Sequence, residues 1–423
     1  MELTDKQRKQ ANAIASLLIQ PDRSSITQGV ELAAALGDQA IFAELLAGMK
    51  PRADTKQRPV SQRRFPMPER ATLFDKPTGM RAWHDLAMVH LLAASELPIR
   101  DKVTSIALGT PIRKYSEPSP SLFLDGLERL TALTHLDLHL TTRDEALDLS
   151  ALERFENLTH LKIRGRAFPG PLPSIAKLES LEGGELSLAP EASFPELRSI
   201  RGEIVVDAAI TPEMMPNLTN IEARGGIALD GFESLGKLSC NGGEVRVLGC
   251  RSIEHLSASV VRFVAPDLRH VGLLDRASPG LDVSQLESLD GLKLNRKSKF
   301  TGGVFPKGTV LLDPFVVLWG TAVTDLGNIG ELPGLEVLLM SQVKAPVSLE
   351  TLRHATDLRV LDIRYSPGVT DLSPLRNLPN LEVLVINDPE RFDVPAELED
   401  RVTKFWRRYQ RASPVEATVK EKS

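Results

Sequence analysis

A leucine pattern that returns at a constant interval constrains this chain more than any other feature of its sequence. The motif Leu-x-x-Leu-x-Leu, with other apolar residues allowed, occurs at 312–317, 335–340, 358–363 and 381–386, so its starts are evenly spaced. A strand with alternating aliphatic residues buries one face, and a single coil can bury that face only against the next coil. The pattern therefore predicts a stacked solenoid in place of one compact core.

The same motif extends upstream with less regular spacing. It occurs at 103–108, 133–138 and 158–163, and in degraded form at 178–181, 197–200, 218–221, 235–238, 253–256, 268–271 and 286–289. The spacing of these starts varies widely, and paired glycines such as Gly242 and Gly243 predict tight turns between coils. We expect coils throughout this region, with the register between 165 and 310 left open.

The segment 369–384, Val-Thr-Asp-Leu-Ser-Pro-Leu-Arg-Asn-Leu-Pro-Asn-Leu-Glu-Val-Leu, resembles the short bacterial, internalin-like leucine-rich repeat. The resemblance covers roughly residues 100–390 and is most specific over 312–386. It implies an α/β solenoid, a horseshoe with a parallel concave sheet that binds a protein or other ligand, and it implies no catalytic residues. The asparagine ladder of that family is mostly absent, because Gln342, Tyr365 and Pro389 stand near its positions.

A solenoid needs caps at both ends, and the flanking segments have helical periodicity. We expect a helical N-terminal region over 1–98, interrupted by a basic, proline-rich linker at 51–78. These helices either cap the solenoid, which spans 99–392, or form an independent module. A C-terminal capping helix is expected within 393–412, with Leu398, Val402, Phe405 and Trp406 on one face, followed by a disordered tail at 413–423.

The composition excludes several classes of function. The net charge of -5 is too small to require a nucleic acid or an anionic membrane as partner, and no apolar run is long enough to span a bilayer. Two cysteines, Cys240 and Cys250, and a start without a signal-like segment favour a cytoplasmic protein. Neither a phosphate-binding loop nor a nucleophile elbow occurs, so we expect no cofactor and no enzymatic activity.

Polar residues occupy the outward positions of two adjacent early strands. Stacked strands lie about 4.8 Å apart, which predicts His135 beside His160 and Asp137 beside Lys162. Histidine and aspartate can bind zinc, but Lys162 competes for the carboxylate, so we expect a polar partner-binding surface and no metal site. The residues assigned to this surface are His135, Asp137, His139, His160, Lys162 and Arg164.

The last strands carry apolar residues at their outward positions. Val337, Val360 and Val383 are predicted to form a stripe, because they occupy the same position in three successive repeats. An apolar stripe with a polar rim is typical of a partner site, although burial under the C-terminal helix or a loop would give the same pattern. The residues adjoining the stripe are Leu339, Val385, Asp362 and Arg364.

These patterns together predict a non-catalytic scaffold that binds an unidentified protein partner on its sheet and does not enter a membrane. One alternative is an effector or enzyme with its activity in the N-terminal region, 1–98. Another is carbohydrate or nucleic-acid binding on the sheet. We expect neither. The N-terminal region shows no nucleophile–base pair, and the strands carry almost no outward aromatic residues on which sugars or bases could stack, so we expect no nucleic-acid partner.

Overall fold

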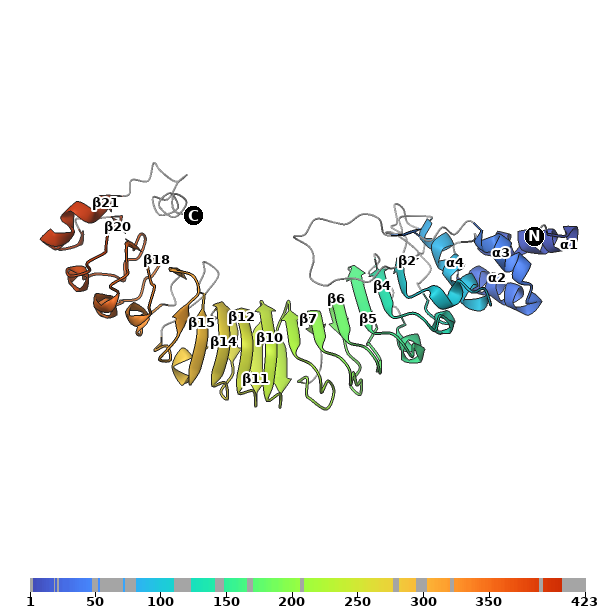
Figure 1. Ribbon diagram of the computed structural model, residues 1–423, viewed down its shortest axis with the longest axis horizontal. Coiled ribbons are helices and arrows are strands. Elements are labelled where there is room, and N and C mark those ends of the chain that lie inside the picture. Colours follow the sequence, from blue (N-terminus) through green and yellow to red (C-terminus); the bar gives the residue numbers. More distant parts are fainter. Residues whose placement is uncertain are drawn as a thin grey trace. The chain divides into compact units, whose positions relative to one another are not determined.

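The computed structural model of the chain forms two compact units, Met1–Leu218 and Thr219–Ser423. Figure 1 labels their helices and strands. The residues that the structure describes are 3–18, 20, 23–47, 52–53, 71–72, 81–109, 123–140, 148–165, 170–205, 209–276, 281–293, 303–319, 323–387 and 391–404. Most of the predicted linker at 51–78 lies outside these residues. In the described helices, no segment is long and apolar enough to cross a membrane.

The first unit begins with four helices, as the sequence predicts: α1 (Asp5–Leu18), α2 (Arg23–Leu36), α3 (Gln39–Leu46) and α4 (Arg81–Ala94). The side chain of Asp38 accepts a hydrogen bond from the Ala40 amide and so caps α3. Helix α4 packs against strand β3 (Ser105–Gly109) and the 3-10 helix η3 (Leu127–Arg129).

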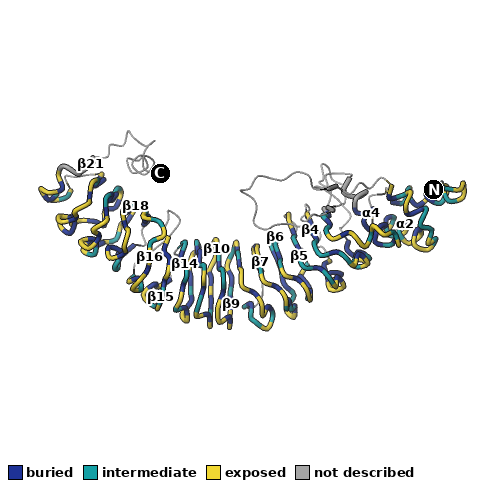
Figure 2. Tube along the Cα trace, in the orientation of Figure 1, coloured by how far each residue is buried: buried dark blue, intermediate teal, exposed yellow. Residues whose placement is uncertain are grey.

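The first unit also contains a parallel sheet, whose first strands precede α4 in the chain. Its strands are β2 (Ala71–Thr72), β3 (Ser105–Gly109), β4 (His135–Leu140), β5 (His160–Gly165), β6 (Ser180–Ser187) and β7 (Ser199–Val205), with β1 (Arg52–Ala53) antiparallel to β2. Along β4 and β7 buried residues alternate with more exposed ones (Figure 2). Leu136, Leu161 and Leu181 lie in register and are buried, which confirms the motif frame in this region.

The second unit continues with shorter coils. The inner strands are β8 (Asn220–Ala223), β10 (Ser234–Asn241), β12 (Ser252–Ser259), β14 (His270–Arg276), β15 (Ser288–Leu292) and β16 (Val310–Leu311). Ser234, Ser252, His270 and Ser288 lie in register at 18-residue intervals. The predicted frames at 268–271 and 286–289 are therefore out of phase, because their last residues, Val271 and Leu289, lie in register with Ile253, the first residue of the frame 253–256. This 18-residue repeat was not predicted, because the region is rich in glycine and its leucine pattern is degraded.

The coils that begin with β8, β10 and β12 carry a second strand in place of a helix, whereas the coil after β14 carries the 3-10 helix η5 (Val283–Gln285). The strands β9 (Ile227–Asp230), β11 (Glu244–Leu248) and β13 (Arg262–Val264) form their own parallel sheet. Gly242 and Gly243 join the two sheets with φ angles of 84° and 69°, which confirms the predicted turn role. Only glycine adopts such consecutive left-handed angles without strain.

The last sheet contains β17 (Phe315–Trp319), β18 (Val337–Ser341), β19 (Val360–Asp362), β20 (Val383–Ile386) and β21 (Val402–Lys404). Leu338, Leu361 and Leu384 stack at the predicted interval. The first frame, 312–317, is wrong by one position, because Leu338 pairs with Val316 and not with Phe315. The chain bends at 312–314, where Asp313 accepts a hydrogen bond from the Phe315 amide, so the strand begins one position late.

Short 3-10 helices form the opposite side of the longer coils: η3 (Leu127–Arg129), η4 (Ser150–Arg154), η6 (Ile329–Glu331), η7 (Glu350–His354) and η8 (Ser373–Leu375). Before each of η6, η7 and η8, a side-chain oxygen accepts a hydrogen bond from the backbone amide two residues later. Asp325 accepts from Gly327 at 2.9 Å and Asp371 from Ser373 at 2.8 Å. The repeated Thr-Asp-Leu sequence therefore starts the turn.

The C-terminal end differs from the expected capping helix. Within the described part of that segment, a 3-10 helix, η10 (Ala396–Arg401), leads into β21, which pairs in parallel with β20. Val402, predicted on a helical face, instead pairs with Leu384, because the unpaired edge of β20 offers backbone hydrogen bonds to an added strand. The remainder of the predicted helix, 405–412, and the predicted tail lie outside the described residues.

Candidate interaction surfaces

The outward face, defined as the strand face opposite the buried leucines, carries a stacked histidine pair in the first unit. The rings of His135 and His160 lie 4.1 Å apart at 15°, which confirms their predicted adjacency. Thr134 and Thr159 each contact the Nδ1 atom of the following histidine through Oγ1, at 2.7 and 2.8 Å. Each of these hydroxyls also lies 3.1 Å from a backbone carbonyl oxygen of the previous coil, that of Thr104 for Thr134 and that of Thr134 for Thr159. Each histidine is thereby linked through a threonine to the coil before it.

Ion pairs join the neighbouring outward residues across the strands. Asp137 lies opposite Lys162 as predicted, but its carboxylate binds Arg164, with Nη2 and Oδ2 2.7 Å apart. Lys162 instead pairs with Glu182 on β6. Register alone predicted the neighbours but not these partners, because long side chains can reach diagonally across strands.

The carboxyl group of Asp137 has a raised pKa. Burial raises it, while the nearby cations Arg164 and Lys162, together with His139, oppose the shift. His139 lies opposite Arg164 on the next strand. The side chains of Lys162, Asp137, Glu182 and Arg164 stay 29%, 32%, 36% and 51% exposed, so this polar array is open to a partner.

In the second unit the predicted apolar stripe forms, and it is largely buried. We define the outward apolar cluster as Phe315, Val337, Leu339, Val360, Val383 and Val385. Val337, Val360 and Val385 are 7%, 2% and 0% exposed, and the other three members are partly buried. A partner role for the stripe stays a prediction.

The polar residues beside that cluster bind each other. The guanidinium of Arg364 holds both carboxylate oxygens of Asp362, with Nε 2.9 Å from Oδ1 and 2.8 Å from Oδ2, and the Arg364 amide donates to the same carboxylate. Asp362 is buried, and Arg364 is nearly so. The pair therefore satisfies itself inside the sheet, and removing one partner would leave a buried charge uncompensated.

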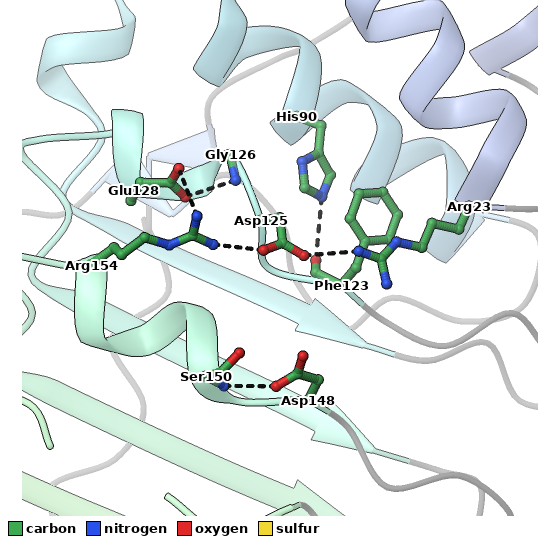
Figure 3. A network of polar contacts seen from close by, with 9 residues as sticks. All are labelled: Arg23, His90, Phe123, Asp125, Gly126, Glu128, Asp148, Ser150 and Arg154. Carbon is green, nitrogen blue, oxygen red and sulfur yellow. Dashed lines mark hydrogen bonds and ion pairs between the residues drawn. The ribbon is translucent and has the colours of Figure 1, made fainter. Parts of the chain in front are cut away.

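A third polar network joins the N-terminal helices to the first coils (Figure 3). His90 on α4 stacks on Phe123 with centroids 4.2 Å apart, and its Nε2 lies 3.3 Å from the Phe123 carbonyl oxygen. Burial lowers the pKa of His90 to about 4. Asp125 pairs with Arg23 at 2.8 Å and Arg154 at 2.6 Å. No sequence pattern pointed to this network, because its members come from separate segments of the chain.

The described residues offer little reactive chemistry. Among them, no group of three or more His, Cys, Asp or Glu side chains could hold a metal ion. Burial raises the pKa of the Cys240 thiol to about 12 and that of Cys250 to about 11, so neither thiol forms a nucleophilic thiolate near neutral pH.

Comparisons with known proteins give a limited result. No family model matches the chain, and no curated protein matches it. Among solved structures, a leucine-rich-repeat protein of Leptospira interrogans is similar at 12% identity and a TM-score of 0.32, over 79% of this chain and 89% of that one. The register of the stacked leucines shows the fold without this comparison: both units are parallel solenoids of leucine-rich coils.

Proposed function

We propose that this protein is a non-catalytic scaffold that holds a protein partner against the outward face of β4–β6. The observation that carries the proposal is the open polar array on these strands, in which the His135–His160 stack lies beside the Asp137–Arg164 and Lys162–Glu182 pairs. Its side chains are ordered by mutual contacts before any partner arrives. Binding therefore costs less side-chain entropy than it would on a surface of loose lysines and glutamates.

The array also specifies what kind of surface fits it. Along one outward row the register runs Asp137, Lys162, Glu182 and Arg201, so charges alternate from strand to strand. A partner strand or loop with the opposite alternation would match it, whereas a uniformly charged polymer would meet repulsion at every second position. This pattern supports a protein partner over a nucleic acid.

The two parts of the expected partner surface differ in what they present. The polar residues of the first unit are open, whereas Val337, Val360 and Val385 in the second unit are buried. The proposal therefore rests on the first unit. No specific contact among the described residues favours the alternatives, catalysis in the N-terminal region or carbohydrate binding.

A paired charge swap tests the proposal. Exchanging Asp137→Arg with Arg164→Asp keeps the internal ion pair but reverses the pattern shown to a partner. The matched control exchanges Glu244→Arg with Arg262→Glu, an exposed pair that lies in register on β11 and β13. Proteins retained by the immobilised full chain from native extract would be identified and their affinities measured by titration.

We expect the 137/164 swap to weaken binding of the principal partner at least about tenfold, which corresponds to about 1.4 kcal/mol. The 244/262 swap should leave the affinity unchanged. Equal affinity for both swapped chains, each folded by circular dichroism, would remove the outward face of β4–β6 as the binding site.

A further inference from the structure

The outward charges of β4–β7 form a row that is complementary to itself when it is read backwards. In register from one strand to the next, the row runs Asp137, Lys162, Glu182 and Arg201. Read from β7 to β4, the same row carries the opposite sign at every position. Two copies of this chain that face each other with their rows antiparallel would therefore set Asp137 against Arg201, and Lys162 against Glu182.

Only one direction of the rotation axis produces this match. Two facing copies of one surface are related by a two-fold axis that lies between them. An axis parallel to the strands reverses the order of the row, whereas an axis parallel to the row places each charge opposite its own copy. Asp137 would then meet Asp137 and Lys162 would meet Lys162, so every position would repel. The order of the charges therefore selects the axis parallel to the strands.

A second outward row has the same property. On β4 and β5 it carries His139 opposite Arg164, and on β6 and β7, after a bulge, it carries Glu185 opposite Glu203. Like charges that lie directly opposite each other destabilise a sheet, and within the described residues neither glutamate forms an ion pair or a side-chain hydrogen bond. The rotation that matches the first row brings Arg164 of the second copy to Glu185, and His139 of the second copy to Glu203. Each of the two carboxylates thereby gains a hydrogen-bond donor.

The third outward row tolerates the same rotation. It runs His135, His160, Ser180 and Ser199. Reversal sets the two histidine rings against the two serine hydroxyls, which can hydrogen-bond to imidazole nitrogens. All three rows therefore accept a second copy without placing like charges together.

We propose that the partner held by the outward face of β4–β6 is a second copy of this chain, docked through the rows of β4–β7 about a two-fold axis parallel to the strands. The dimer rests on the proposed function, because the second copy is the partner of the same polar array. At the axis, the Lys162–Glu182 pair of one copy meets that of the other, and the four charges close into one alternating ring. Such a network stabilises more than isolated surface ion pairs do. Four strands spaced about 4.8 Å apart make a small interface, so the dimer dissociates in the micromolar range.

Sedimentation equilibrium of the full chain at increasing concentration tests the dimer. Lys162→Glu alone sets two carboxylates against each other on both sides of the axis, and Glu182→Lys alone sets two ammonium groups there. Each variant should weaken self-association at least about tenfold. An equimolar mixture of the two should associate within about threefold of the unaltered chain, because each altered side chain then faces the opposite charge on the other variant.

Two charge exchanges within one chain act as matched controls. Lys162→Glu combined with Glu182→Lys restores the alternating ring with its signs exchanged, and should dimerise like the unaltered chain. Glu244→Arg combined with Arg262→Glu lies outside the three rows and should also change nothing. By contrast, Asp137→Arg combined with Arg164→Asp sets like charges against Arg201 and Glu185 of the second copy, and should weaken the dimer at least about tenfold.

Three results would overturn the second copy as the partner, provided that each variant is folded by circular dichroism. The first is an unaltered chain that stays monomeric up to about 500 μM, a concentration at which small interfaces associate. The second is a mixture of Lys162→Glu and Glu182→Lys chains that associates no better than either chain alone. The third is a dimer that none of these substitutions changes. A monomeric chain that still retains another protein from native extract, and loses it on the 137/164 swap, rejects the dimer and leaves the proposed function intact.

Discussion

Gln342 and Tyr365 occupy the same place in successive coils, and both adopt the left-handed backbone conformation, with φ of 60° and 58°. This conformation strains any residue with a side chain, most of all a bulky one. The family that the sequence resembles places asparagine nearby. The departure from that family pattern at these positions therefore has a measurable energetic consequence.

Replacing Tyr365 by glycine should raise the free energy of unfolding by about 0.5–1 kcal/mol, because relief of strain exceeds the entropy lost by glycine. The Tyr365 side chain is 46% exposed, so little burial is lost. Urea denaturation measures the change. The neighbouring Arg364→Gly, at a residue without a positive φ and holding Asp362, should lower stability. A less stable Tyr365→Gly chain would contradict the strain argument.

The stability of the chain should fall as the pH drops from 6.5 to 4. In this range the unfolded chain protonates His90, whose ordinary pKa is 6.5, while burial in the folded protein holds that pKa at about 4. The difference amounts to about 3 kcal/mol once the pH reaches the folded-state value. Denaturant titrations at several pH values should show a shallower slope in His90→Gln than in the unaltered chain. His354→Gln, at an exposed position, is the control, and equal slopes in all three proteins would exclude His90 as the cause.

Asp371→Ala should lower the free energy of unfolding by about 1 kcal/mol, because the Ser373 amide loses its acceptor at the start of η8. The same hydrogen bonds from Ser373 lower the pKa of Asp371, so their contribution is present above its ordinary pKa and declines as the pH falls below it. Asp371→Asn keeps an acceptor oxygen and should retain most of the stability. Thermal unfolding distinguishes the two variants, and equal losses would argue against the turn hydrogen bond.

Gly243→Ala should disrupt the second unit, with a loss of more than about 3 kcal/mol or no folded protein. Its φ is 69°, and an added Cβ would lie 2.2 Å from the backbone nitrogen of Gly226 in the previous coil. Gly308→Ala provides the matched control, because its φ is 93° but nothing lies within 4 Å of an added Cβ. The control should lose only about 1–2 kcal/mol from strain. Similar losses in both variants would mean that contact between coils is unimportant there.

The sequence predicted the parts of the fold that depend on leucine spacing. Leu338, Leu361 and Leu384 stack as expected, and the adjacency of His135 and His160 followed from the two motif frames in which they stand. The frame around Phe315 failed because a local bend at Asp313, invisible in the hydrophobic pattern, delays the strand by one position.

Contacts set by long side chains, and the burial of the outward valines, could not be predicted from spacing. Arg164 reaches Asp137 diagonally, although register places Lys162 opposite that carboxylate. Strand alternation places Val360 on the outward face, but it does not determine how far neighbouring side chains bury it.

The asparagine residues that bond one coil to the next also stand at other positions than the expected ones near Gln342, Tyr365 and Pro389. Asn157, Asn217 and Asn380, each directly before the first leucine of a motif, donate through Nδ2 to carbonyls of the preceding coil at 2.7 to 2.8 Å. The Asn-Leu pair that recurs in the sequence marks the positions of these asparagines.

The short coils of the second unit cannot accommodate a change in their length. Between β8 and β12 every residue belongs to a strand or to a glycine-containing corner that connects two strands, so an insertion or deletion within a strand would turn its following side chains to the opposite face. The longer coils of β17–β20 can absorb such a change in their 3-10 arms. Length variation among natural variants of this protein should therefore accumulate in the arms around η6, η7 and η8 and be nearly absent from 220–259.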